Sequence, residues 1–183
     1  MENAQFRSNK ISKLATLLFF VAMLLTFNSM TALAQSTDYW TTTANAGATE
    51  DEANPAKPTY TNQTAAVNGG PTGLYALRYN LTAVDGLFNS GNGFMRLRVR
   101  DNGTAANVLV TLRRSNIFAG GIETVATFDS DSIAAGSGFQ TPTDVLFTHS
   151  FDFTNYAYWL DVTFNRMDAT GTPGFGGAIV GTL

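Results

Sequence analysis

The chain has 183 residues, a formal net charge of −3 at pH 7, one histidine and no cysteine, and only 14% of its residues are charged. The absence of cysteine excludes disulfides and thiol nucleophiles, and a single histidine excludes a metal site built from several imidazoles. Nothing favours a nucleic-acid partner, because phosphates require clustered positive charge.

The first 34 residues have the three-part pattern of a cleavable secretory signal. Arg7, Lys10 and Lys13 precede an apolar run over residues 14–27, and small residues end at Ala34. The apolar run is shorter than the roughly 20 residues that a membrane-spanning helix needs. We therefore expect cleavage, a mature chain without a transmembrane helix, and export to the periplasm, the cell surface or the extracellular space.

The mature chain is expected to be one domain, residues 35–183. Residues 35–73 are rich in Thr, Ala, Asn and Pro, and they predict a loop-rich segment with one or two edge strands, since proline cannot donate to a sheet ladder. Residues 74–183 carry the sharper pattern of the core. Its first strand is marked by Tyr75, Leu77, Tyr79 and Leu81, which alternate with mostly polar residues.

A hairpin is predicted around Asn102-Gly103, which separates two alternating runs. The apolar residues of the runs are Met95, Leu97 and Val99 on one side and Val108, Val110 and Leu112 on the other. A two-residue turn would pair Leu97 with Val108 and Met95 with Val110, with both apolar sets on one face.

A second hairpin is predicted around Thr154-Asn155, where two aromatic-rich runs meet. Its predicted pairs are Phe153 with Tyr156, Phe151 with Tyr158, Phe147 with Val162, and Val145 with Phe164. Further strands are expected over 122–128 and 178–182. Seven or eight short strands without helical periodicity predict an all-β fold, either a sandwich, a jelly roll or a small barrel, and we expect an antiparallel, jelly-roll-like β-sandwich.

Trp159 is the first candidate for ligand binding. The alternation that buries Tyr158 and Leu160 turns its indole to the opposite face, beside Ser150 and Asp161. An apolar ring flanked by hydrogen-bonding groups suits a sugar ring, so we expect a saccharide-facing patch of Trp159, Asp161, Asp152 and Ser150. The alternative is that other parts of the chain cover the indole.

Two further candidates are ionic. Arg96, Arg98 and Arg100 project from one face of one strand and predict an anion site, for acidic glycans or lipid head groups, which Arg78 and Arg113 could extend; the alternative is a solvated face balanced by carboxylates. Asp129 and Asp131, with Asp144, could supply oxygen ligands to calcium, although paired Asp residues are ordinary at turns. No other cofactor is indicated.

His149, the one imidazole, is expected at the edge of the core, opposite Leu160 and bonded to backbone rather than catalytic. No sequence motif marks a nucleophile, so no catalytic residue is predicted. The leading interpretation is a secreted, non-enzymatic sandwich that binds polysaccharide or cell-surface glycan or has a structural role at the surface. An enzyme using Asp and Glu, and a small outer-membrane β-barrel, are the alternatives. The oligomeric state is not predicted.

Overall fold

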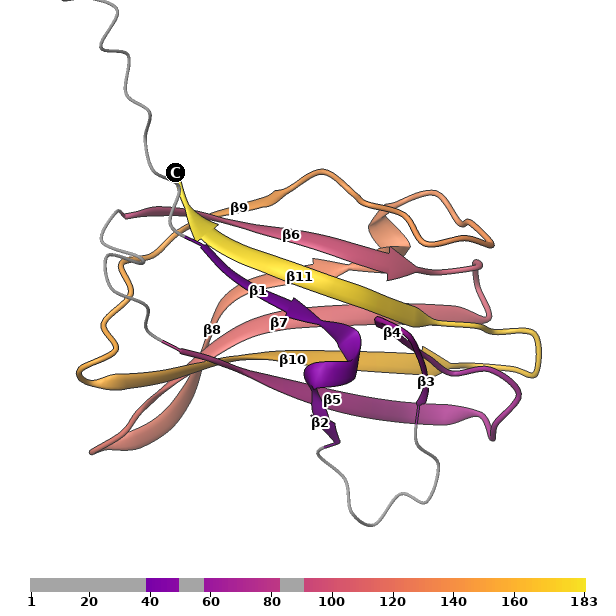
Figure 1. Cartoon of the computed structure of the whole chain (residues 1–183), viewed down its shortest axis with the longest axis horizontal. Helices are drawn as coiled ribbons and strands as arrows, with labels where there is room; N and C mark the ends of the chain where they lie inside the picture. Colours follow the sequence, from indigo (N-terminus) through magenta and orange to yellow (C-terminus); the bar gives the residue numbers. More distant parts are fainter. Residues whose placement is uncertain (1–38, 50–57, 83–90) are drawn as a thin grey trace, which may run out of the picture. The chain divides into compact units, whose positions relative to one another are not determined.

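The computed structural model describes residues 39–49, 58–82 and 91–183, and its strands and short 3-10 helices follow the chain as Figure 1 shows. The elements are β1 (Tyr39–Thr43), η1 (Ala44–Ala46), β2 (Ala48–Thr49), β3 (Thr59–Thr61), β4 (Thr64–Ala66), β5 (Gly73–Leu81), β6 (Asn92–Arg100), β7 (Ala106–Asn116), β8 (Gly120–Asp129), η2 (Ser130–Ser132), β9 (Val145–Thr148), β10 (Tyr156–Arg166) and β11 (Gly174–Thr182). The predicted signal peptide, residues 1–34, lies outside the described residues.

The strands form two antiparallel sheets. The first, sheet A, has the order β3-β4-β11-β6-β9, and β1 pairs with β11 further along the edge that β4 uses. The second, sheet B, has the order β2-β5-β10-β7-β8. In Figure 1, β1, β11, β6 and β9 lie in one layer, and β5, β10, β7 and β8 lie in the other. The predicted all-β sandwich is confirmed.

The core lies between the sheets and is built by side chains at alternate positions. Strand β5 buries Tyr75, Leu77, Tyr79 and Leu81, as its alternation predicts, because side chains at i and i+2 share a face. Facing strands add the other buried residues of this cluster, among them Met95, Leu97, Val99, Val108, Val110, Leu112, Leu160, Val162, Phe164, Phe175 and Val180.

The predicted hairpin at Asn102-Gly103 is wrong. Strand β6 pairs with β11 and β9, whereas β7 pairs with β10 and β8, so the turn carries the chain from one sheet to the other. Asp101, only 3% exposed, stabilises the turn between the sheets. Its carboxylate accepts hydrogen bonds from Gly103 N at 2.8 Å and from Ser130 Oγ at 2.5 Å. The predicted burial of both apolar sets is nevertheless confirmed.

The second predicted hairpin is wrong for the same reason. Strand β9 pairs with β6 in sheet A, and β10 lies between β5 and β7 in sheet B. Phe151 and Phe153 do meet Tyr158, with ring centroids 4.8 and 4.9 Å apart, but they come from the loop between β9 and β10 rather than from a paired strand.

The remaining strand predictions are close to the structure. The strand expected over 122–128 is the inner part of β8, and the one expected over 178–182 is the second half of β11. The described part of the N-terminal segment holds four short strands, more than the one or two expected, and three of them, β1, β2 and β3, each pair with a single neighbour and so lie at sheet edges. Within the described ranges, no helix is long and apolar enough to cross a membrane.

Candidate functional site

Trp159 lies on the outer face of sheet B, as its alternation predicts, but its indole is covered. The residue is 7% exposed, and the guanidinium of Arg78, on the neighbouring strand β5, lies 4.9 Å from the ring centroid. The predicted exposed sugar platform at Trp159 is therefore wrong, because a side chain from the paired strand occupies the ring face. Its Nε1 has no hydrogen-bond partner among the described residues.

The other members of the predicted patch do not gather around this indole. Asp161, 7% exposed, accepts hydrogen bonds from Arg78 Nε at 2.8 Å and from Arg78 Nη2 at 3.2 Å, and Arg113 Nε lies 3.3 Å from its Oδ2. Asp152 instead contacts Asn155 and the hydroxyl of the inward-facing Tyr158. Ser150 is exposed in the same loop as Asp152.

Arg96, Arg98 and Arg100 do form a stripe, on the outer face of sheet A along β6. Arg96 is held by Asp144 through two hydrogen bonds of 2.8 Å, which raises the pKa of Arg96 and lowers that of Asp144. Arg100 donates to Thr172 O and to Asn68 Oδ1, both at 2.8 Å, and partial burial lowers its pKa. Arg78 and Arg113 do not extend the stripe, because they lie in sheet B.

A groove of about 290 Å³ crosses sheet A beside this stripe. Its floor is formed by β11, and its two sides by β1 and by β6 with the segment that precedes β9. The central strand carries small residues here, so the surface sinks between longer side chains on its neighbours. The described residues that line the groove are Thr41, Thr42, Arg96, Leu97, Arg98, Thr141, Gly176, Gly177, Ala178 and Ile179.

Arg98 is seated by two contacts. A Cβ on Gly176 would lie 2.9 Å from Arg98 Cγ and 3.0 Å from its Cδ, so the glycine makes room for the aliphatic stem. The guanidinium lies 5.1 Å from the centroid of Phe139, and Arg100 lies 5.3 Å from the same ring. Phe139 is fixed in turn because the next residue, Gln140, exchanges two backbone hydrogen bonds with Val99 of β6.

The three carboxylates proposed for calcium are not brought together. Asp129 accepts from Asp131 N and from Asn107 Nδ2 at the start of η2, whereas Asp144 is bound to Arg96. No group of three or more His, Cys, Asp or Glu side chains in the described part of the chain could hold a metal ion.

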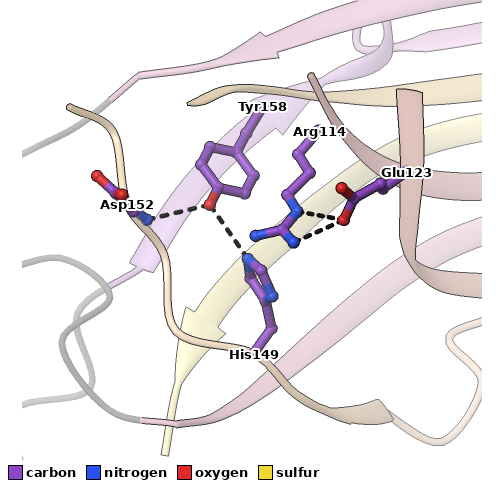
Figure 2. A network of polar contacts seen from close by, with 5 residues as sticks. All are labelled: Arg114, Glu123, His149, Asp152 and Tyr158. Carbon is purple, nitrogen blue, oxygen red and sulfur yellow. Dashed lines mark hydrogen bonds and ion pairs between the residues drawn. The ribbon is translucent and has the colours of Figure 1, made fainter. Parts of the chain in front are cut away.

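His149 lies at one end of the core, where Figure 2 shows it facing Tyr158, with the Arg114–Glu123 pair alongside. Its Nε2 lies 3.1 Å from the Tyr158 hydroxyl, which also accepts from Asp152 N at 3.0 Å. The predicted position at the core edge is right, but the imidazole is bonded to a phenol rather than to backbone. Burial, followed by the charge of Arg114, lowers the pKa of His149.

Sequence reasoning found the arginines of the groove but missed its other residues. Thr41 and Thr42 lie in a segment expected to be mostly loop, and Gly176 and Gly177 precede the predicted final strand. The signal that could have located the floor is the Gly-Phe-Gly-Gly-Ala run at 174–178, since small residues in a strand often mark a close approach.

The sequence matches no family of known proteins and no curated protein. Solved structures with a similar fold include the CBM36-1 domain of a multidomain xylanase from the hindgut metagenome of Trinervitermes trinervoides (13% identity, TM-score 0.45, covering 80% of this chain and 98% of that one). They also include the xylan-binding module CBM15 (11%, 0.45, 80% and 97%) and a family 30 carbohydrate binding module (15%, 0.42, 78% and 81%). Identities this low carry no residue role over to this chain.

Proposed function

We propose that this chain is an exported, non-enzymatic glycan-binding module whose ligand lies in the groove over β11. The observation that carries the proposal is the hollow itself. It has a floor of small residues at Gly176, Gly177 and Ala178, with threonine hydroxyls on one side and guanidinium groups on the other. Its volume, about 290 Å³, is at the lower end for small-ligand sites.

This arrangement suits the chemistry of a saccharide. A sugar ring has an apolar C–H face and a rim of hydroxyls, so it fits a smooth floor with donors and acceptors at the sides. Ile179 adds aliphatic surface to the floor, Thr41 and Thr141 offer hydroxyls that both donate and accept, and the guanidinium of Arg98 offers several N–H donors.

Binding without catalysis follows from the residue types. None of the described residues that line the groove is Asp, Glu or His. Hydrolysis of a glycosidic bond generally requires two carboxyl groups placed across the bond, one acting as acid and the other as base or nucleophile. Export, which rests on the signal-like N-terminus, would bring such a module to polysaccharides outside the cytoplasm.

The proposal is tested by filling the groove. Thr41 is exposed on β1 and lines the groove, so Thr41→Trp should obstruct it without disturbing the core. Thr127→Trp makes the same substitution at an exposed position of β8 in sheet B and is the matched control. We expect affinity electrophoresis through gels containing neutral and acidic polysaccharides to show retardation of the parent chain and of Thr127→Trp, and its loss in Thr41→Trp. Equal retardation of both variants would rule out the groove.

A further inference from the structure

Arg98 differs from the other arginines that the structure describes in sheets A and B, because each of those has a hydrogen bond or an ion pair. Arg96 is paired with Asp144, Arg78 and Arg113 with Asp161, and Arg114 with Glu123. Arg98 is exposed, and in the part of the chain that the structure describes it donates no hydrogen bond and has no carboxylate partner. The groove is thus bordered by a positive charge that no carboxylate of the described residues compensates.

Arg100 strengthens this local charge. Its hydrogen bonds go to a carbonyl and an amide oxygen, which are neutral, so its charge is not cancelled either. Both guanidinium groups lie over the ring of Phe139, and their strand positions are about 7 Å apart. A cation–π contact orients a guanidinium, but it does not neutralise it, and like charges this close repel.

We infer that the glycan held by this groove is acidic, with Arg98 binding its carboxylate or sulfate groups and Arg100 adding positive charge nearby. This inference rests on the proposed function and specifies its ligand class. A planar guanidinium donates two parallel N–H bonds to either oxyanion, which gives charge-assisted contacts. Because Arg98 is already seated by Gly176 and Phe139, little side-chain freedom is lost when the anion binds.

The negative net charge of the chain means that binding of an acidic glycan requires a local concentration of positive charge. The chain carries a net charge of −3, so a polyanion is repelled at long range and is attracted only where positive charge is concentrated. Binding to an acidic glycan should therefore depend on individual arginines of β6 and should weaken as salt screens the contact.

The test compares four polymers at fixed ionic strength: polygalacturonate for carboxylate, dextran sulfate for sulfate, unsubstituted dextran as the neutral glycan, and poly-L-glutamate as a polyanion without sugar. We expect at least one acidic glycan to bind about tenfold tighter than dextran and poly-L-glutamate, with affinity falling as salt rises. The first two arms identify the anionic group.

Two variants with the same charge change assign the site. Arg98→Gln should weaken acidic-glycan binding about tenfold, as expected for a lost charge-assisted hydrogen bond. Arg113→Gln in sheet B should change it less than twofold, and circular dichroism checks that both variants are folded. Equal binding of dextran, equal binding of poly-L-glutamate, or equal effects of the two variants would overturn the inference. Absence of binding to every glycan would overturn the proposed function as well.

Discussion

Gly176 lies directly beneath the stem of Arg98, on the strand next to it. A methyl group at residue 176 would come within 2.9–3.2 Å of three carbons of that side chain. This glycine of β11 therefore determines where the guanidinium of Arg98 lies beside the groove. The shape of the groove floor and the position of the charge at its side therefore both depend on Gly176.

We expect Gly176→Ala to displace Arg98, since the added carbon meets the first three carbons of that side chain. Affinity for an acidic glycan should fall several-fold, and the melting temperature should change by only a few degrees. Gly91→Ala is the control, because a Cβ there makes only an ordinary contact of 3.7 Å with Ser150 Oγ. Unchanged affinity in Gly176→Ala would show that the position of Arg98 is unimportant.

Asp161 should be a stability residue rather than a ligand residue. Asp161→Asn leaves Arg78 and Arg113 without their carboxylate at a site where the aspartate is 7% exposed. Removing one partner of a fully buried pair costs about 3–5 kcal/mol, but both arginines are partly solvated, so we expect about 1–3 kcal/mol from urea unfolding. Glu123→Gln breaks a more exposed pair and should cost less than about 1 kcal/mol.

The variant Trp159→Phe tests whether the ligand binds on the outer face of sheet B or on that of sheet A. The indole lies under Arg78 and is remote from the groove in topology, because β10 belongs to sheet B. Glycan affinity measured by calorimetry should stay within about twofold of the parent chain. A loss of tenfold or more would return the binding site to the outer face of sheet B.

The lowered pKa of His149 predicts how the stability of the fold depends on pH. Its folded-state pKa lies below 6.5, because burial and Arg114 disfavour the imidazolium more than Glu123 favours it. As pH falls below about 6.5, the unfolded chain takes up a proton that the folded chain resists, so stability falls until the folded pKa is reached.

Melting temperatures between pH 8 and pH 5 should therefore decline in the parent chain and decline less in His149→Gln. The carboxylates with shifted pKa values, Asp144, Asp152 and Asp168, titrate below their usual value of 3.8 and so do not contribute in this window. A steeper decline in the variant would contradict the assignment.

Alternation along the chain predicted which side chains are buried, but it could not predict which strands pair. Met95 and Val110 point inward in the structure, as they would in a hairpin. Two strands joined by a tight turn bury their apolar sets whether they pair in one sheet or face each other across the core. The burial of both apolar sets beside Asn102-Gly103 is therefore compatible with both arrangements.

Prediction of the candidate site was limited for the same reason, because strand pairing could not be predicted from the sequence. The stripe of Arg96, Arg98 and Arg100 needs only the period of one strand, so it was predictable. The cover over Trp159 depends on β5 lying next to β10, and the groove depends on β1 and β6 lying on either side of β11. These neighbours are distant in sequence, and no local pattern indicates them.

The central claim is that the ligand lies over β11, and backbone amide chemical shifts measured during titration with an acidic oligosaccharide test it most directly. We predict that the largest shifts occur at Thr41, Arg98, Thr141, Gly177 and Ile179, with little change at Asn80, Trp159 and Asp161. Shifts concentrated on those sheet B residues, or spread evenly over the surface, would contradict the account.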